Sequence, residues 1–354
     1  MNKEQVQNLC GQASLTIVEA MQKIDENEKG ILFITTEDER LIGAVTDGDI
    51  RRWLIKTADL SSKVEKLMNK NPQFLYVGDR KNAYDFMKKK MIHALPILDS
   101  EARVVDIALA DEKDFASINS RALENVPVII MAGGKGTRLY PYTKILPKPL
   151  IPIGDIPILE RIINRFYEYG VSQYYMTVNY KKGMIKSYFA ELNPRYSIEY
   201  VEEDKPLGTA GSIQLIGKEF ETPVIVMNCD TLIEADYEDI YEYHKKSGNA
   251  MTIVSALKNL EVPYGVLKTG ENGVITAFEE KPKLSYLVNT GMYVVDGAML
   301  NKIPKDKFFH MTHLAEKLMR EGLQVGMYPI SEESFLDMGE FEEMRRMEDK
   351  LNIK

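Results

Sequence analysis

Cysteine is scarce in this chain, because Cys10 and Cys229 are the only two among 354 residues. Two isolated cysteines cannot build a disulfide framework or a structural zinc site, which agrees with a reducing compartment. The sequence also lacks a run of about eighteen apolar residues that could cross a bilayer, and its first residues lack the apolar core of a signal peptide. We therefore expect a cytoplasmic protein that does not contact a membrane.

The chain also lacks an excess of positive charge, since 45 lysines and arginines face 53 aspartates and glutamates, for a net charge of −8. Proteins that bind nucleic acid usually carry a basic excess, so nucleic acid is not expected as a partner. The hydrophobic share of 44% and the charged share of 28% are typical of a soluble protein. The length exceeds that of one ordinary domain, and we expect two.

A change in composition marks the domain boundary. Residues 112 to 125 are polar and lack β-branched runs, between an apolar segment that ends at Ala110 and another that opens at Val126. This pattern predicts an N-terminal domain over residues 1–119 and a C-terminal domain over residues 124–354.

In the C-terminal part, a predicted buried strand at 126–131 leads into the loop AGGKGTRLYPYTKILPKPL, residues 132–150. Glycines at 133, 134 and 136 let backbone N–H groups approach a polyphosphate, and four cations supply positive charge: Lys135, Arg138, Lys144 and Lys148. The loop is not a P-loop, which would need Gly-Lys-Ser/Thr, and Leu139 stands where a dinucleotide fingerprint needs its third glycine. We expect a phosphate site here; a glycine turn with solvated lysines is the alternative.

Residues 133–149 match, at every defined position, the signature G-G-x-G-T-R-L-x-P-x-T followed by K-P, and the chain therefore resembles the sugar-1-phosphate nucleotidyltransferases. The resemblance implies a Rossmann-like α/β domain with a mixed central sheet. It implies an enzyme that joins a nucleoside triphosphate to a sugar-1-phosphate and releases pyrophosphate. It also implies that Arg138 and Lys148 are catalytic, and that the nucleotide is bound by Ala132, Gly133, Gly134, Gly136 and Thr137.

An aspartate follows the next strong apolar run of this domain. Asp230 comes after the run at 224–227, at the carboxyl end of a predicted central strand, where ligands gather in α/β sheets. In the family the matching aspartate is catalytic and holds Mg²⁺ with a second aspartate, here Asp337. Mg²⁺ needs only a few carboxylates beside water and substrate phosphates, so two protein ligands suffice. Phe335 and Glu340 depart from the family pattern around Asp337, and a turn-capping role is the alternative for Asp230.

The segment YVEEDKPLGTAGS at 200–212 resembles the family's base-reading loop, with Leu207 and Gly208 against the nucleobase. Relatives that use UTP or dTTP tend to have glutamine where this chain has Glu203. A carboxylate can only accept hydrogen bonds, so it matches the two adjacent N–H donors of guanine and mismatches thymine or uracil. We therefore predict GTP as the substrate; a solvated loop acid is the alternative for Glu203.

The family's sugar contacts have counterparts in three short motifs. They are Tyr264 and Gly265, then Glu280 and Lys281, then Asn289 and Thr290. Their polar groups can donate to or accept from sugar hydroxyls, and the lysine can reach a phosphate. Each motif alone could be ordinary loop polarity, and together they predict a pocket for a hexose-1-phosphate without naming the hexose.

The N-terminal domain contains two similar units. The first has a predicted helix at 16–26, strands at 30–35 and 41–45, and a helix from Asp49; the second has a helix at 81–89 and strands at 94–98 and 103–110. The segment GAVTDGDIRR at 43–52 resembles the ligand loop of CBS domains, which occur as pairs (Bateman modules) and bind nucleotides. Thr46 and Arg51 would then contact a phosphate and Asp49 the ribose, although Asp49 could instead be a helix N-cap. Asp106 and Leu109 replace the glycine and threonine in the second unit, so at most one nucleotide is expected.

The order of domains resembles the glucosamine-1-phosphate guanylyltransferases of bacterial legionaminic acid synthesis, whereas the catalytic motifs resemble mannose-1-phosphate guanylyltransferases equally well. We predict a guanylyltransferase regulated by a nucleotide at the CBS pair, and a homo-oligomer formed through those pairs. Two alternatives stay open. One is uridylyl, thymidylyl or cytidylyl transfer on the same scaffold, and the other is a nucleotide sensor with a degenerate transferase domain.

Overall fold

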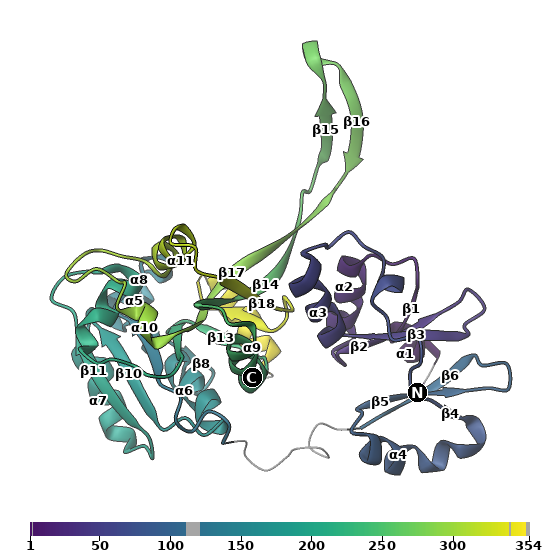
Figure 1. The fold of residues 1–354 in the computed structure, drawn as a ribbon, viewed down its shortest axis with the longest axis horizontal. Helices are drawn as coiled ribbons and strands as arrows, with labels where there is room; N and C mark the ends of the chain where they lie inside the picture. Colours follow the sequence, from purple (N-terminus) through teal and green to yellow (C-terminus); the bar gives the residue numbers. More distant parts are fainter. Residues whose placement is uncertain (2, 111–120, 340, 352–354) are drawn as a thin grey trace. The chain divides into compact units, whose positions relative to one another are not determined.

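The computed structural model describes residues 1, 3–110, 121–339 and 341–351 (Figure 1). The chain divides into two compact units, the first comprising Met1–Ile118 with Lys258–Tyr286 and the second comprising Asn119–Leu257 with Leu287–Lys354. Most of the predicted boundary at 112–125 lies outside the described residues. The grouping of Lys258–Tyr286 with the first unit differs from the predicted domains, 1–119 and 124–354, which stay a prediction.

Two repeats of the same α/β motif form most of the first unit. The first repeat contains α1 (Lys3–Asn8), β1 (Cys10–Gln12), α2 (Ile17–Asn27), β2 (Ile31–Thr35), β3 (Leu41–Thr46) and α3 (Asp47–Thr57). After the 3₁₀ turn η1 (Val64–Lys66), the second contains β4 (Leu75–Tyr76), η2 (Val77–Asn82), α4 (Ala83–Lys90), β5 (Ala94–Leu98) and β6 (Val104–Leu109). The helices and strands predicted for the two repeats are therefore present, with ends that differ by a few residues.

Strand pairing shows that the repeats share one topology. In each, a short first strand pairs parallel with the second strand, and the second pairs antiparallel with the third. The register also shifts at the corresponding place, between Ile34 and Thr35 in β2 and between Ile97 and Leu98 in β5. Side chains of both repeats, among them Phe33 and Ile107, belong to one hydrophobic cluster, so the two repeats share a core.

The remainder of the first unit is a two-stranded ribbon, green in Figure 1. It pairs β15 (Gly265–Thr269) antiparallel with β16 (Ile275–Glu280), and the 3₁₀ turn η7 (Glu271–Gly273) joins the strands. Most of its side chains are exposed, because a ribbon of two strands is a single layer with little to pack against.

The second unit is built on a seven-stranded mixed sheet in the order β11-β10-β7-β12-β17-β14-β18. The strands are β7 (Val128–Ala132), β10 (Gln173–Val178), β11 (Ser197–Glu202), β12 (Val224–Asn228), β14 (Met251–Glu261), β17 (Lys283–Val295) and β18 (Val325–Ile330). The first four strands in this order run parallel, and β17 is antiparallel to β12. The predicted α/β class with a mixed central sheet is confirmed.

Both faces of this sheet are buried. Along β7, Val128 and Ile130 belong to one hydrophobic cluster, while Ile129 and Met131 belong to another on the opposite face. Such continuous apolar strands are typical of parallel sheets covered by helices on both sides. The main helices are α6 (Ile158–Glu168), α7 (Lys182–Leu192), α9 (Tyr237–Ser247), α11 (Met311–Arg320) and α12 (Phe341–Lys350).

Shorter elements lie in the connections of the second unit. The helical ones are η4 (Thr137–Leu139), α5 (Tyr142–Ile145), η5 (Lys148–Leu150), α8 (Gly208–Gly211), η6 (Ser212–Ile216) and α10 (Gly297–Leu300). The extended ones are β8 (Pro152–Ile153) with β9 (Ile156–Pro157), and β13 (Thr231–Ile233) with β19 (Phe335–Asp337).

Candidate active site

Four parallel strands end at the same edge of the large sheet, because Val178 of β10 pairs with Ala132 of β7 and with Glu202 of β11, and Asn228 of β12 pairs with Met131. The segments that follow these strands therefore start side by side. They include the predicted glycine-rich loop, the predicted base-reading segment and the predicted metal-binding aspartate. The carboxyl edge of a parallel sheet is where α/β proteins bind ligands.

The glycine-rich loop packs closely on two of the predicted site residues. A Cβ on Gly133 would lie 2.4 Å from Oε1 of Glu203. Gly136 has φ +64°, and a Cβ there would lie 2.8 Å from Cβ of Lys148. Glycine is required at Gly136, because the close Lys148 Cβ and the positive φ exclude other residues, whereas a side chain at Gly133 would have to displace the Glu203 carboxylate. Gly134, in contrast, has no atom within 4 Å of the Cβ position, and Thr137 is exposed, so both are open to a ligand.

Lys148 and Asp230 form an ion pair across 82 residues of sequence. Lys148 is 7% exposed, which is unusual for a lysine and requires a partner for its charge. The two residues come from η5 and from the turn after β12. The structure thus brings together two of the three predicted catalytic residues.

Asp337 joins the same cluster through the pairing of β13 with β19. Thr231 stands opposite Asp337, and the N–H of Met338 donates to the carbonyl of Asp230 at 2.9 Å. Burial and the charge of Asp230 raise the pKa of Asp337, while Lys148 and Arg138 act in the opposite direction. A raised carboxyl pKa beside a second carboxylate is the behaviour of two acids that share one site.

Arg138 lies at the mouth of this cluster, exposed on η4. A Cβ on Gly339 would lie 2.9 Å from a carboxylate oxygen of Asp337 and 3.4 Å from a guanidinium nitrogen of Arg138, so the arginine and the aspartate face one narrow space. We call Arg138, Lys148, Asp230 and Asp337 the charge cluster. Glu340, part of the sequence departure near Asp337, lies outside the described residues.

Two adjacent carboxylates can hold a divalent cation, which binds through a few carboxylates together with water and substrate phosphates. The pKa of Asp337 is raised by burial and by the charge of Asp230, which fits this use, because a bound cation would relieve the repulsion between the two carboxylates. Within the described ranges, no group of three or more His, Cys, Asp or Glu side chains could hold a metal ion. A full protein cage for a metal is therefore not present in that part of the chain.

Glu203 is 6% exposed, which argues against the alternative of a solvated loop acid. Its Oε2 accepts from the N–H of Leu207 at 3.2 Å, while Oε1 faces Gly133. Burial raises the pKa of Glu203, and the hydrogen bond from Leu207 partly counters this effect. Gly208, with φ +79°, sits where a Cβ would lie 2.6 Å from the carbonyl of Phe309. The predicted base-reading residues thus form one buried, tightly packed corner beside the glycine loop.

The predicted sugar-binding residues fall into two groups. In the second unit, Asn289 donates to the hydroxyl of Tyr293 at 2.8 Å, and the Thr290 hydroxyl donates to the carbonyl of Val254 at 2.8 Å. On the ribbon of the first unit, Gly265 stands opposite Glu280, and the Lys281 N–H donates to the Tyr264 carbonyl at 3.3 Å. Each group is held together, but the groups belong to different units, and their shared role stays a prediction.

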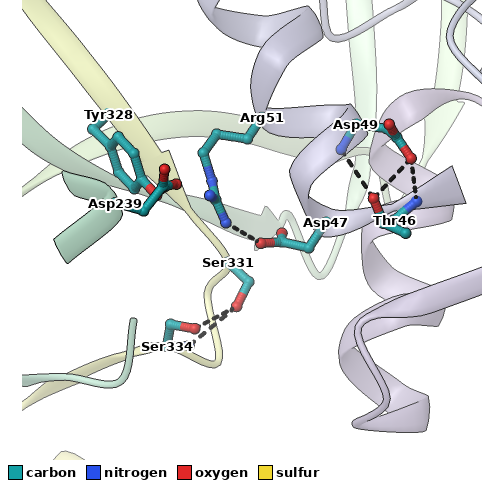
Figure 2. A network of polar contacts seen from close by, with 8 residues as sticks. All are labelled: Thr46, Asp47, Asp49, Arg51, Asp239, Tyr328, Ser331 and Ser334. Carbon is teal, nitrogen blue, oxygen red and sulfur yellow. Dashed lines mark hydrogen bonds and ion pairs between the residues drawn. The ribbon is translucent and has the colours of Figure 1, made fainter. Parts of the chain in front are cut away.

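Figure 2 shows how the predicted regulatory residues bond to their neighbours. Thr46 is the N-cap of α3, and Asp49 is the third residue of that helix rather than its cap. One Asp49 oxygen accepts from the N–H and hydroxyl of Thr46, at 2.9 and 2.7 Å, and the other accepts from Arg52 at 2.6 Å. Arg51 donates to Asp47 at 2.7 Å. These contacts form a capping box with two adjacent ion pairs.

The sequence reasoning missed three residues at the same edge of the sheet. Asn179, Tyr180 and Lys181 follow β10 directly, and their side chains bond to the segments described above. The available signal was their position after the buried strand Tyr174–Val178, because polar residues at that place point toward the ligand edge.

The fold agrees with comparisons to known proteins. Residues 127–352 match the family model described as nucleotidyl transferase, and residues 12–56 match the model of the CBS domain. The first match covers more than half of the chain, and the protein therefore belongs to the nucleotidyl transferase family. The CBS match covers the first repeat of the N-terminal part, in agreement with the predicted resemblance.

Individual relatives carry the names of sugar-phosphate enzymes. A mannose-1-phosphate guanyltransferase of Aspergillus oryzae is 34% identical over 185 residues, which are 49% of this chain and 50% of the relative. A UTP–glucose-1-phosphate uridylyltransferase of Synechocystis is 33% identical over 215 residues, 55% of each chain. The chain thus spans about half the length of the curated relatives it matches.

Solved structures show the same fold. The crystal structure of HddC from Yersinia pseudotuberculosis is matched with a TM-score of 0.51 at 26% identity, over 64% of this chain and 99% of that one. A putative glucose-1-phosphate thymidylyltransferase from Bacillus anthracis is matched with a TM-score of 0.51 at 22% identity, over 63% and 94%. In the described part of the chain, no helix has the length and apolar character needed to cross a membrane.

Proposed function

We propose that this protein transfers a nucleotidyl group from a nucleoside triphosphate to a sugar-1-phosphate, which yields a nucleotide sugar and pyrophosphate. The observation that carries the proposal is the charge cluster, in which two cations and two carboxylates from four separate segments meet at the carboxyl edge of the sheet. The family membership and the names of the relatives support the same reaction class.

The reaction needs charge neutralisation more than it needs a base. The second ionisation of a phosphate monoester lies near pH ~6, so an oxygen of the sugar phosphate is already anionic at neutral pH. That oxygen forms a bond to the α-phosphorus of the triphosphate, and the bond from the α-phosphorus to the bridging oxygen of pyrophosphate breaks, with the two oxygens roughly in line. The protein therefore acts by positioning the reactants and stabilising negative charge.

The charge cluster supplies that stabilisation. Arg138, exposed at the mouth of the site, braces the departing β and γ phosphates through its planar fork of N–H donors. Lys148, held on Asp230, lies behind Gly136 and contacts the α-phosphate or the incoming sugar phosphate. The backbone N–H groups of the loop from Ala132 to Thr137 bind the triphosphate.

Asp230 and Asp337 are the residues that would hold Mg²⁺, and the raised pKa of Asp337, caused by burial and by the charge of Asp230, supports that assignment. A bound ion would supply positive charge that neutralises the phosphates. The ion pair with Lys148 supports the view that the Asp230 carboxylate is ionised and placed to attract positive charge.

The buried Glu203 supports guanine as the base. A buried carboxylate that receives one N–H from Leu207 keeps acceptor capacity for the paired N–H donors of guanine and offers no donor to thymine or uracil. The guanyltransferase names among the relatives favour GTP, whereas the uridylyltransferase name keeps UTP as the second candidate.

The identity of the sugar is proposed from the order of domains and from the names of the relatives. Glucosamine-1-phosphate follows from the order of domains, with CBS repeats before the transferase as in legionaminic acid synthesis, and mannose-1-phosphate is favoured by the names of several relatives. Thr46, Asp49 and Arg51 would bind a regulatory nucleotide at the CBS repeats, and these repeats would join copies into a homo-oligomer.

A panel of triphosphates and sugar phosphates tests the proposal through release of pyrophosphate. The expected result is magnesium-dependent turnover with GTP and glucosamine-1-phosphate or mannose-1-phosphate. Binding of a nucleotide without turnover of any pair would instead identify a nucleotide sensor whose transferase domain is degenerate.

A further inference from the structure

The turn Asn179–Lys181 lies between the two segments that are proposed to bind the nucleotide. It follows Val178, which pairs with Ala132 on one side and with Glu202 on the other. The glycine-rich loop begins after the first of these partners, and the base-reading segment begins after the second. Each residue of the turn bonds to one of these two segments.

Tyr180 and Lys181 hold the second half of the glycine-rich loop, which comprises residues 132–150. The Tyr180 hydroxyl donates to the carbonyl of Thr143 at 3.0 Å, and Nζ of Lys181 donates to the carbonyls of Lys144 and Ile145, both at 2.7 Å. These carbonyls lie in the short helix α5, where helix geometry leaves carbonyl groups without partners inside the helix. A lysine ammonium at a helix carboxyl end satisfies such groups and is favoured by their partial negative charge.

The held segment packs directly on the site. A Cβ on Gly136 would meet Cγ2 of Thr143 at 3.0 Å and Cβ of Lys148 at 2.8 Å, so Thr143, Gly136 and Lys148 are in contact. Thr143 itself is buried. The position of the segment between Arg138 and Lys148 is therefore fixed on one side by Gly136 and on the other by Tyr180 and Lys181.

Asn179 holds the base-reading segment in a similar way. Its Nδ2 donates to the carbonyl of Glu203 at 3.1 Å, and the N–H of Glu203 donates to the carbonyl of Val178 at 3.0 Å. The backbone of Glu203 is thus bonded to the turn through its carbonyl and to the last residue of β10 through its N–H, and these two bonds fix the direction of its buried side chain.

The backbone of Lys181 is in the left-handed region, with φ +52° and ψ 33°. This conformation costs a residue with a Cβ on the order of 1 kcal/mol, and it persists only where the surrounding structure imposes it. Strain of this kind is common at ligand sites. Here it occurs at the residue that makes two of the three hydrogen bonds to the loop.

We infer that Asn179, Tyr180 and Lys181 are positioning residues. They hold the base-reading segment and the glycine-rich loop at a fixed distance from each other, so that the triphosphate fits between them. Asn179 acts through Glu203 and affects the choice of base, whereas Tyr180 and Lys181 act through Thr143 and affect the phosphates of every triphosphate alike. This inference rests on the proposed function, because it names the substrate that the spacing serves.

The first test compares Lys181→Met with Lys181→Arg, and with Lys186→Met as a control of equal charge. Lys186 lies on helix α7, directly after Lys181, and its ammonium pairs with Glu202 instead. Steady-state kinetics use the triphosphate that the wild-type protein prefers. Lys181→Met is expected to lower kcat/KM for it about 10- to 100-fold, in line with the effect of small misplacements of substrate groups. The KM for the sugar phosphate should stay within about twofold.

Lys181→Arg should recover most of this loss, because a guanidinium can also donate to two carbonyls. Tyr180→Phe should show a smaller loss with the same pattern, and Lys186→Met should match the wild type. Equal kinetics for Lys181→Met and Lys186→Met would overturn the inference. A loss in Lys181→Met that arginine does not recover would also overturn it, if thermal melting shows both variants folded.

The second test separates the two halves of the turn. Asn179→Ala should change the ratio of kcat/KM values for GTP and dTTP by about tenfold, the scale of one displaced hydrogen-bonding group. Lys181→Met should lower both values and leave the ratio unchanged. If both variants changed the ratio equally, the separate roles would be wrong.

Calorimetry of triphosphate binding without a sugar phosphate separates failure of the inference from failure of the proposed function. If the wild type bound a triphosphate but turned over no sugar phosphate, the proposed function would fail, and weaker binding by Lys181→Met would still support the positioning role. If the wild type turned over substrates and Lys181→Met bound and reacted normally, the inference alone would fail. A wild type that binds no triphosphate overturns both.

Discussion

The turn after β7 and the turn after β3 have a similar layout, in which a buried strand leads through glycine and charged residues into a helical segment. Their charged groups nevertheless find partners at very different separations. In the second turn Asp49 bonds to Thr46 and Arg52, three residues away on either side. In the longer segment that follows β7, Lys148 of η5 bonds to Asp230 across 82 residues.

This difference separates local structure from a binding site. A capping box forms wherever a helix must satisfy its first N–H groups, and it needs no ligand to explain it. No helix or strand requires two carboxylates, a lysine and an arginine to meet at one sheet edge. Because buried charges cost free energy, such a cluster indicates a function that uses them.

The strongest test of the comparison removes a charge from the cluster. Arg138→Ala should lower kcat/KM at least about 100-fold, or about 3 kcal/mol of transition-state stabilisation, as expected for loss of one preorganised group that meets developing charge. The pyrophosphate-release assay measures it. Arg320→Ala, at an exposed arginine on α11, is the matched control and should keep normal turnover. Near-normal activity of Arg138→Ala would remove it from the mechanism.

A change at Glu203 sharpens the comparison within the large sheet, because it alters what the buried corner recognises and leaves the charge cluster intact. The glutamine of Glu203→Gln can both donate and accept, so preference should shift from GTP toward dTTP or UTP by about 1–3 kcal/mol, roughly 5- to 150-fold in the ratio of kcat/KM values. Competition between the triphosphates measures this ratio. An unchanged ratio would show that Glu203 does not contact the base.

Much of the fold follows from local pattern, and the exceptions have physical causes. The strand Ala94–Leu98 was predicted to the residue, because turn residues bound a fully apolar run. The helix predicted from Asp49 begins instead at Asp47, since the Thr46 hydroxyl caps it and Asp49 completes the box from the third position. Capping geometry of this kind shifts the boundary by two residues without changing the pattern of apolar residues.

The site could be predicted where a motif carries its chemistry and not where backbone atoms are the partners. Arg138, Lys148 and Asp230 lie in signature segments, and the structure brings them together with Asp337. Lys181 bonds to two carbonyl groups about 36 residues away, and no side-chain pattern marks those carbonyls. The sequence did not indicate that Lys258–Tyr286 groups with the first unit, because the predicted domain boundary rests on the change in composition at 112–125 alone.

The second turn gives a smaller prediction. Asp49→Ala should lower the free energy of unfolding by about 1 kcal/mol, the usual effect of losing a helix cap, because the Asp49 carboxylate no longer accepts hydrogen bonds from the N–H and hydroxyl of Thr46 or from Arg52. Urea unfolding measures it, with Asp85→Ala on α4 as a control at an exposed carboxylate. Calorimetry with adenine and cytidine nucleotides completes the test. If the wild type bound a nucleotide and Asp49→Ala did not, this turn would be a ligand site as well as a helix cap. The contrast between its local bonds and the binding site at the large sheet would then be weaker.

The smallest expected effect is on stability, and it depends on pH. Burial raises the pKa of Glu203 in the folded protein, so the folded state holds its proton more tightly than the unfolded state does. The associated stability is present below the unfolded pKa of about 4.3 and is lost as pH rises through the folded pKa. At pH 7 the buried carboxylate therefore costs stability, and Glu203→Gln should be more stable than the wild type by about 1 kcal/mol, the usual trade-off at a functional residue. Near pH 4 the difference should shrink, because both side chains are then largely neutral. Urea unfolding at the two pH values measures the difference in the free energy of unfolding between Glu203→Gln and the wild type. A difference that does not depend on pH would mean that Glu203 is not the buried acid proposed to contact the base.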